Sequence, residues 1–332
     1  MKYRIGSFNV HNLSMAAGRD LDRIAGIIKD YNLDIVAMQE VLSEGKILTG
    51  VMDSKNISGQ AKAYECSLKY RLGKDWDICW RDPKTKAKNY PFLGKDARGE
   101  GYAFLWNTSR VELPVNEKGN KIFPRIWRNY HIYADEKLMR LIREPCYGRF
   151  VVEGRKARPV EIRLINTHIV YGKPKADNLA VDLDFGAITM RKNEFQVLAG
   201  KIYPRINEHY KEIKNRVPYT LILGDYNLNL EGSQVTNASI PEVVCFNERG
   251  EIAEQDKGYK IYTVQKELST LKKEKAGLAN NYDHFSYDDR VKGRVSKEAE
   301  TIKVFNNDNE EELIKYRKEV SDHLPIVIEI DI

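Results

Sequence analysis

The sequence predicts a single domain of the α/β class, and three observations lead to this prediction. Segments with the alternation of a strand are followed by segments with helical spacing along the whole chain. No low-complexity linker or solenoid-type repeat divides the 332 residues. Hydrophobic residues make up 42% of the chain and charged residues 31%, a balance that can build a core and excludes intrinsic disorder. These patterns are compatible with parallel and with antiparallel strand pairing.

The elements are expected in a definite order along the chain. Residues 3–10 alternate as a strand does and lead into a loop at Asn9. Residues 21–31 place Leu21, Ile24 and Ile28 at helical spacing. Further strands are expected at 34–38, 102–106, 219–223, 283–287 and 325–330, a hairpin at 150–153 and 160–167, and a helix at 190–206. Residues 266–275 are predicted to form either a charged helix or an excursion.

Three protein classes are disfavoured by composition. No run approaches the ~18 apolar residues that a membrane helix needs, which excludes an integral membrane protein. No apolar signal segment precedes the first strand-like pattern, so we expect a cytoplasmic location. The four cysteines are scattered without a CxxC pair, which predicts reduced thiols and argues against a zinc ribbon or a disulfide scaffold. They are Cys66, Cys79, Cys146 and Cys245.

Positive charge is concentrated in one part of the chain. The net charge is +6, and residues 110–158 alone hold twelve Lys/Arg against six Asp/Glu. Aromatic residues such as Trp127 lie among these basic residues, a pattern typical of surfaces that bind a phosphate backbone. The alternative is a solvated face with some core aromatics. The arginines expected to contact phosphate are Arg125, Arg128, Arg143 and Arg149.

Polar residues recur just after apolar strands, where loops on a rigid sheet usually build sites. The set is Asn9, Glu40, His168, Asp225, Asn227, Asp283, Asp322 and His323. Carboxylate and amide oxygens suit a hard ion such as Mg²⁺. Histidines suit general acid and base roles near neutral pH. Each residue alone is uninformative, and the ordered combination predicts a site.

That combination resembles a known superfamily. The matching motifs are Ser7-Phe8-Asn9-Val10, Val36-Ala37-Met38-Gln39-Glu40-Val41, Glu100-Gly101-Tyr102, Arg143-Glu144-Pro145, Ile165-Asn166-Thr167-His168, Leu223-Gly224-Asp225-Tyr226-Asn227, Tyr282-Asp283-His284 and Ser321-Asp322-His323-Leu324-Pro325. In these motifs and their order the chain resembles the endonuclease/exonuclease/phosphatase superfamily, and within it the deoxyribonuclease I branch. The resemblance implies one domain over 1–332, a four-layer α/β sandwich of two mostly antiparallel sheets flanked by helices. It also implies expanded loops near 116–140 and 171–190.

The resemblance implies a role for each site residue. Glu40 is expected to bind Mg²⁺ or Mn²⁺ together with Asn9 and Asp322. Asp225 and Asn227 match residues that hold the scissile phosphate and orient the attacking water. Arg143 matches an arginine that contacts phosphate in the family, and Arg98 is also expected to contact the substrate phosphate.

The two histidines of the branch are each paired with a carboxylate. Glu100 is expected to partner His168, and Asp283 is expected to partner His323. A carboxylate on one imidazole nitrogen fixes the tautomer and raises the pKa, so the other nitrogen can exchange a proton. One histidine would then activate water while the other protonates the leaving oxygen.

Two departures from the branch leave the substrate open. Leu42 stands where the branch has an arginine and Arg98 where it has a tyrosine, both at positions that read duplex DNA in the family. The leading prediction is a metal-dependent endonuclease that acts on nucleic acid, DNA rather than RNA. A phosphatase of a small molecule, such as an inositol phosphate or a nucleotide, is the alternative. A catalytically silent nucleic-acid-binding module is the third reading. No membrane partner is expected.

Overall fold

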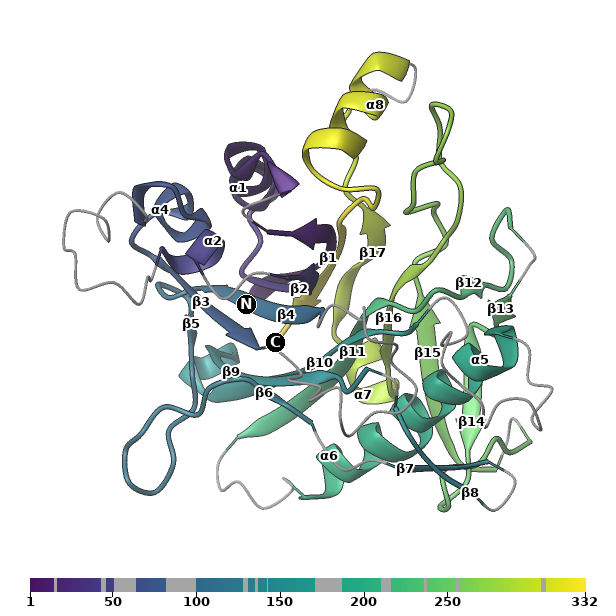
Figure 1. Cartoon of the computed structure of the whole chain (residues 1–332). Helices are drawn as coiled ribbons and strands as arrows, with labels where there is room; N and C mark the ends of the chain where they lie inside the picture. Colours follow the sequence, from purple (N-terminus) through teal and green to yellow (C-terminus); the bar gives the residue numbers. More distant parts are fainter. Residues whose placement is uncertain are drawn as a thin grey trace.

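Two β-sheets pack face to face, and helices cover the outer side of each sheet (Figure 1). The computed structural model describes residues 1–14, 17–42, 46–50, 64–81, 100–127, 131–134, 137–141, 143–170, 187–209, 216–235, 238–254, 257–305 and 309–332. Parts of the two loops predicted to be expanded, at 128–130, 135–136 and 171–186, lie outside the described residues, as does Arg98.

The first sheet has the strand order β17–β18–β1–β2–β4–β3. Its strands are β1 (Lys2–Leu13), β2 (Ile35–Val41), β3 (Trp76–Arg81), β4 (Gly101–Asn107), β17 (Val295–Thr301) and β18 (Ile326–Asp331). Strands β1 and β2 run parallel, and the other neighbours run antiparallel. Both ends of the described chain therefore meet in the middle of this sheet, where β1 pairs with β18.

The second sheet has the order β14–β15–β16–β11–β10–β9–β5, with β6 also paired to β9. Its strands are β5 (Val111–Glu112), β6 (Arg125–Ile126), β9 (Cys146–Glu153), β10 (Pro159–His168), β11 (Val217–Asp225), β14 (Val243–Phe246), β15 (Tyr259–Val264) and β16 (Asp283–Tyr287). Only β10 and β11 are parallel among these pairs. The predicted hairpin is confirmed by the antiparallel pairing of β9 with β10. Two short ladders complete the strands: β7 (His131–Ala134) with β8 (Lys137–Arg140), and β12 (Asn229–Leu230) with β13 (Ser239–Ile240).

The helices lie around the two sheets, and one of them also contributes Val291 to the core between the sheets. They are α1 (Leu21–Asp30), α2 (Lys46–Thr49), α4 (Leu68–Leu72), η3 (Arg155–Ala157), α5 (Ala187–Val197), η4 (Leu198–Ile202), α6 (Tyr203–His209), α7 (Asp289–Lys292) and α8 (Glu310–Glu319). The helix predicted at 190–206 is confirmed as α5 and α6, joined by the π-helical turn η4. Among the described helices, none combines the length and the apolar character needed to cross a bilayer.

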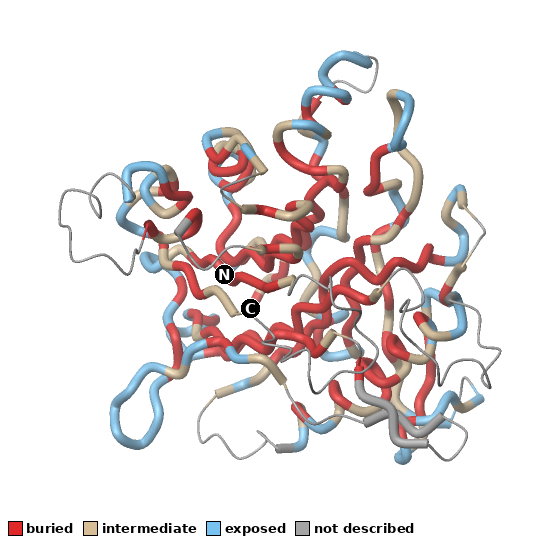
Figure 2. The backbone as a smooth tube through the Cα atoms, viewed as in Figure 1, coloured by how far each residue is buried: buried red, intermediate tan, exposed pale blue. Residues whose placement is uncertain are grey.

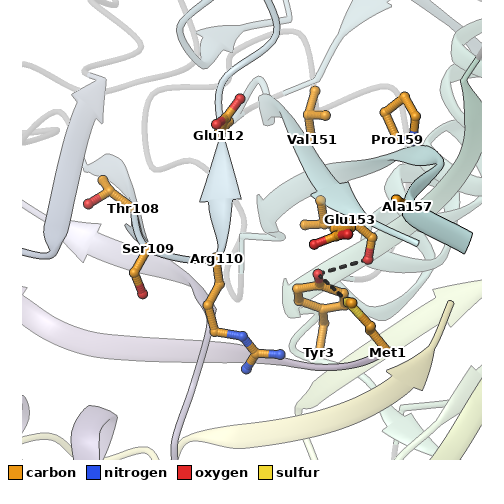
Figure 3. A pocket seen from close by; sticks show the side chains of 11 residues that line it. Met1, Tyr3, Thr108, Ser109, Arg110, Glu112, Val151, Glu153, Ala157 and Pro159 are labelled. Carbon is orange, nitrogen blue, oxygen red and sulfur yellow. Dashed lines mark hydrogen bonds between the residues drawn. The ribbon is translucent and has the colours of Figure 1, made fainter. Parts of the chain in front are cut away.

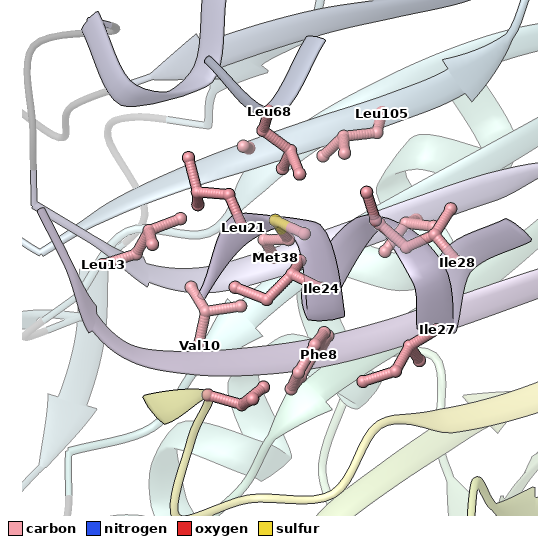
Figure 4. Close-up of a cluster of buried hydrophobic side chains, with 14 of the residues drawn as sticks. Phe8, Val10, Leu13, Leu21, Ile24, Ile27, Ile28, Met38, Leu68 and Leu105 are labelled. Carbon is pink, nitrogen blue, oxygen red and sulfur yellow. The ribbon is translucent and has the colours of Figure 1, made fainter. Parts of the chain in front are cut away.

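Period-two alternation in the strands produces the layers. In β1, Ile5 belongs to the core between the two sheets, whereas Phe8 and Val10 belong to the core under α1. Figure 4 shows Phe8 and Val10 packed beneath Ile24 of α1. A third core lies between the outer face of the second sheet and α5, η4 and α6. Burial is therefore concentrated in the sheets and exposure at the periphery (Figure 2).

Several local features differ from expectation or extend it. Residues 266–275 form an excursion rather than a helix, held by isolated bridges from Thr270 to His323 and from Leu271 to Leu278. The predicted helix over 21–31 is confirmed as α1, whose N-cap Asp20 accepts a hydrogen bond from the backbone N–H of Arg23. All four cysteines are free, as the sequence predicts.

Candidate active site

The two parallel strand pairs end at the same place, one pair from each sheet. The carboxyl ends of β1 and β2 carry Asn9 and Glu40, and those of β10 and β11 carry His168 and Asp225. Asp283 opens β16 directly opposite Asp225 in the ladder. The fold therefore brings residues that are far apart in sequence to one end of the sandwich.

Strand register aims these side chains into the space between the sheets. Asn9 lies four residues after Ile5, on the same face of β1, and Ile5 belongs to the inter-sheet core. His168, Asp225 and Asp283 likewise share a strand face with inter-sheet core residues two or four positions away. Each apolar strand thus ends in a polar residue that continues the inner face.

His168 is held between two carboxylates. Its Nδ1 lies 3.1 Å from Oε2 of Glu100, and its Nε2 lies 3.4 Å from Oδ2 of Asp225. Glu100 is in turn bound by Arg143, whose Nη2 donates to Oε1 at 2.7 Å. Burial works against the charge of Glu100, but His168 and Arg143 outweigh it and lower the pKa of this carboxyl. An ionised Glu100 can orient the His168 ring.

His323 has the corresponding arrangement on the other side. Its Nδ1 lies 2.8 Å from Oδ2 of Asp283, which also accepts a 2.7 Å hydrogen bond from the Ser269 hydroxyl. Its Nε2 lies 3.7 Å from Oδ2 of Asp225. Burial lowers the pKa of His323, but the neighbouring carboxylates, with Asp283 first, outweigh burial and raise it to about 10. His323 therefore keeps its second proton at neutral pH.

Asp225 is the point on which both imidazoles converge. It is buried, and its Oδ2 also accepts from Nδ2 of Asn9 at 3.1 Å, while its Oδ1 accepts from the backbone N–H of Asn227 at 2.8 Å. Burial raises the pKa of Asp225, although the two imidazoles act in the opposite direction. Gly224 has φ 143°, and a Cβ there would lie 1.9 Å from the Thr167 carbonyl oxygen, so only glycine allows this close approach of β10 and β11.

Glu40 reaches the site through an irregularity at the end of β2. Its φ is 58°, and the ladder with β4 shifts register between Met38 and Val41. Its Oε1 accepts from Nδ2 of Asn9 at 3.1 Å, and its Oε2 accepts from the backbone N–H of Asn12 at 3.1 Å. The bulge turns this carboxylate toward the strand ends instead of the core.

Asp322 is the third residue of the predicted metal set, and it reaches Glu40 through His11. The His11 Nδ1 atom lies 2.8 Å from Oδ1 of Asp322 and 3.9 Å from Oε2 of Glu40. Burial opposes ionisation of Asp322, but His11 and His323 prevail and lower its pKa to about 2. The carboxylates of Glu40 and Asp322 and the amide of Asn9 supply oxygen atoms of the kind a hard divalent cation prefers. Ligand atoms of Glu40, Glu100 and His168 lie within 4.8 Å of one another, so the residues at this end of the sheets fit such an ion.

The comparisons with known proteins rest on structure. No protein-family model matches the sequence, and no curated protein sequence matches it. The chain is similar to an endonuclease/exonuclease/phosphatase from Bacteroides vulgatus, with 15% identity, 100% of this chain and 99% of that chain covered, and a TM-score of 0.53. The chain has the endonuclease/exonuclease/phosphatase fold. A family protein from Leptotrichia buccalis C-1013-b is also similar, with 16% identity, coverage of 99% and 100%, and a TM-score of 0.50.

This similarity confirms the predicted four-layer sandwich of two mostly antiparallel sheets. At such low identity it establishes the endonuclease/exonuclease/phosphatase fold and assigns no residue. The predicted site residues that the structure describes all lie at the strand ends or in direct contact with residues there. Their individual roles remain predictions.

In this endonuclease/exonuclease/phosphatase fold, a buried amide network that sequence reasoning missed supports the site. Nε2 of Gln39 donates to Oδ1 of Asn166 at 2.7 Å and lies 3.1 Å from the Ser7 hydroxyl. Nδ2 of Asn166 donates back to the Met38 carbonyl at 3.0 Å. The network joins β2 to β10 just below Glu40 and His168, so it sets the spacing of the two sheets there.

Fewer arginines of the basic stretch 110–158 are free to contact a phosphate backbone than its composition suggests. The expectation that Arg149 contacts phosphate is wrong, because this residue is 8% exposed and donates twice, at 2.9 Å each, to the Glu161 carboxylate. Arg125 is exposed and lies over the Trp127 ring at 5.5 Å. Arg128, by contrast, lies outside the described residues. Arg125 therefore presents an exposed guanidinium that a polymer could contact.

A cavity of about 390 Å³ lies at the opposite ends of β1 and β10 (Figure 3). Its lining includes Tyr3, Arg110 and Pro159, and β10 runs ten residues from Pro159 to His168, a span of about 30 Å. The Tyr3 hydroxyl donates to the Glu153 carbonyl at 2.9 Å, and Arg110 pairs with Asp34. None of the predicted site residues that the structure describes lines this cavity.

The raised pKa of His323 predicts a pH dependence of stability. Because the folded-state value of about 10 exceeds the usual 6.5, His323 should stabilise the fold fully below about pH 6.5 and lose this contribution as pH rises through about 10. This contribution is measured as the difference in free energy of unfolding between wild type and His323→Gln, from denaturant unfolding in EDTA at pH 6 to pH 10. The difference in free energy of unfolding between the two proteins should become smaller toward pH 10. A difference that does not change with pH would contradict the raised pKa of His323.

Proposed function

We propose that the chain is a divalent-metal-dependent hydrolase that cuts phosphodiester bonds in nucleic acid, as an endonuclease on DNA. One observation carries this proposal. Two imidazoles, each backed by its own carboxylate, place their Nε2 atoms 3.4 and 3.7 Å from the same oxygen of Asp225. Two groups that can transfer protons therefore lie on either side of the Asp225 carboxylate. Hydrolysis of a phosphodiester needs an acid and a base at one phosphorus atom, and this arrangement can supply both.

The electrostatics of the pair support a division of labour. His323 holds its proton at neutral pH, so we assign it as the general acid that protonates the leaving oxygen. His168 then remains as the base that takes a proton from the attacking water, with Glu100 orienting its ring. Asp225 and Asn227 would position that water and the phosphate between the two rings.

Arg143 is well placed to hold a phosphate oxygen. Its Nη2 is engaged by Glu100, but its buried Nη1 has no hydrogen-bond partner among the described residues. A buried guanidinium nitrogen without a partner is unfavourable, and a phosphate oxygen would satisfy it. A divalent ion held by Glu40, Asn9 and Asp322 would supply further neutralisation of phosphate charge when bound.

A small-molecule phosphatase is the second candidate. The ion pairs of the basic stretch favour it, because Arg110, Arg149 and Arg155 are paired with Asp34, Glu161 and Asp331 at 2.6–2.9 Å. These pairs reduce the positive surface that a polymer backbone could use. The nuclease remains our first proposal because Arg125 and Trp127 offer an exposed guanidinium beside an aromatic ring.

Salt dependence of binding tests the polymer. We expect the wild-type chain in EDTA to bind labelled DNA with log K falling by about 0.9 per phosphate contact for duplex, or about 0.7 for single strands, per unit of log salt. Arg125→Ala should make the slope shallower by about one contact on that scale. The matched control is Arg155→Ala, which removes the same charge from an arginine paired with Asp331. It should leave the slope unchanged, and no binding at low salt would contradict the proposal.

A further inference from the structure

The loop that follows β11 alternates between the site and the helical layer. Asp225 and Asn227 lie at the site, whereas Tyr226 and Leu228 are buried in the core under α5. Asn227 has a φ of 51°, a left-handed conformation that asparagine adopts more readily than most residues. The loop therefore presents Asn227 to the site only while its backbone keeps this uncommon conformation.

The side chain of Asn227 is fixed together with its backbone. The backbone N–H donates to Oδ1 of Asp225 at 2.8 Å, and the side-chain Nδ2 donates to the Ile169 carbonyl at 2.7 Å. An amide group carries two N–H donors and an acceptor oxygen, so one donor and the oxygen remain for the substrate. These two atoms can meet a phosphate oxygen and a water.

Arg191 of α5 holds this loop from the helical layer. It is 5% exposed, and its Nη1 donates to the main-chain carbonyl of Asn227. Burial of a guanidinium is unfavourable unless its donors are engaged, and here one donor reaches from a helix to a loop at the site. A second buried side chain, His284 of β16, donates through Nε2 to the next carbonyl, that of Leu228, at 2.7 Å.

Two consecutive carbonyl oxygens of the loop are therefore bound by side chains that take no part in the proposed chemistry. This has an electrostatic consequence, because a carbonyl oxygen carries partial negative charge and would repel a phosphate if it turned toward the site. Arg191 binds the carbonyl of Asn227 itself, and so it acts on the residue whose amide would meet the substrate.

We propose that Arg191 is a positioning residue: by binding the main-chain carbonyl of Asn227, it holds the Asn227 amide in place for a phosphate oxygen and the attacking water. The inference rests on the proposed function and adds to it a residue from the helical layer. A displacement of about 1 Å at a reacting centre can cost about 10²-fold in rate. Loss of the Arg191 contact should therefore lower kcat more than substrate affinity.

A double-mutant cycle separates positioning from support of the fold. Arg191→Met removes the donors and keeps a long side chain, Asn227→Ala removes the amide, and one chain combines both changes. Initial rates of metal-dependent hydrolysis of bis(4-nitrophenyl) phosphate, below the melting temperature of every variant, give kcat and KM. Lys192→Met is the matched control, because it removes a positive charge from the exposed neighbour on the same helix.

We expect Arg191→Met to lower kcat by about 10- to 10²-fold, to change KM by less than about threefold, and to have little further effect in an Asn227→Ala chain. Lys192→Met should match wild type. Losses that multiply would show that Arg191 acts independently of Asn227 and would overturn the inference. If the methionine variant does not fold, Arg191→Lys replaces it in the cycle, because the shorter side chain moves the donor away from the carbonyl. A wild-type kcat in that variant would overturn the inference.

A second readout needs no activity. In the metal-free chain with ¹⁵N-labelled asparagine, the side-chain amide resonance of Asn227 is identified by its loss in Asn227→Ala. It should shift in Arg191→Met and stay in place in Lys192→Met. An unshifted resonance in Arg191→Met would overturn the inference. A wild-type chain that hydrolyses no phosphodiester would instead overturn the proposed function, and the resonance would still decide whether Arg191 positions Asn227.

Discussion

Replacing His323 by alanine is expected to lower the rate of phosphodiester hydrolysis by at least about 10²-fold, the usual scale for one proton-transfer group. His168→Ala should cost as much, because the two imidazoles flank the same carboxylate and each would move one proton per turnover. Initial rates at saturating metal, on single- and double-stranded DNA, measure both losses. A full rate in either variant would contradict its assignment.

The partners of the histidines give a sharper form of this test. Asp283→Asn should reproduce part of the His323 loss, and the double variant should be little worse than His323→Ala alone, because residues that act as a unit are not additive. Ser269→Ala removes a hydroxyl that donates to the Asp283 carboxylate and accepts from the backbone N–H of Asp283, and it should have a smaller effect than Asp283→Asn. Losses of Asp283 and His323 that multiply would show that they do not work together. The same logic applies to Glu100 with His168.

Replacing Glu40 by glutamine is expected to abolish Mg²⁺- or Mn²⁺-dependent hydrolysis. The substitution preserves the shape of the side chain and removes the charge that a hard cation needs. The melting temperature should stay within a few degrees, because Glu40 packs in none of the hydrophobic cores. Activity with added metal and melting of the metal-free chain are the measurements.

The matched control for Glu40 is Glu112→Gln, which makes the same change beside the cavity at the other end of the sheets. It should leave both activity and metal dependence unchanged. Full activity of Glu40→Gln, or wild-type activity undiminished by EDTA, would contradict the metal assignment.

Much of the fold follows from local patterns in the sequence. Helix α1 was predictable because its apolar residues recur at helical spacing and Asp20 caps it. Helix α8 has only a weak helical pattern of apolar residues in the sequence, since only Leu313 and Tyr316 are buried within it. Local patterns also leave strand direction open, and the single parallel pair in each sheet appears only once the strands are placed.

The candidate site was predictable in composition but not in contacts. Asn9, His168 and Asp225 stood out because polar residues ended apolar strands. His11 carries no comparable signal, because its partner Asp322 lies at the other end of the chain. Arg149 misleads for a different reason: its partner Glu161 lies on the adjacent strand, so the sequence does not distinguish this buried ion pair from surface charge.

The most direct test of the account is a hydrolysis assay with several substrates side by side. Labelled single-stranded DNA, duplex DNA, RNA and inositol phosphates are incubated with the chain in Mg²⁺, in Mn²⁺ and in EDTA. The account predicts metal-dependent shortening of DNA, no cleavage in EDTA, and none with a His168→Ala/His323→Ala chain. Release of phosphate from the small phosphomonoesters while every nucleic acid stays intact would contradict it and identify a phosphatase.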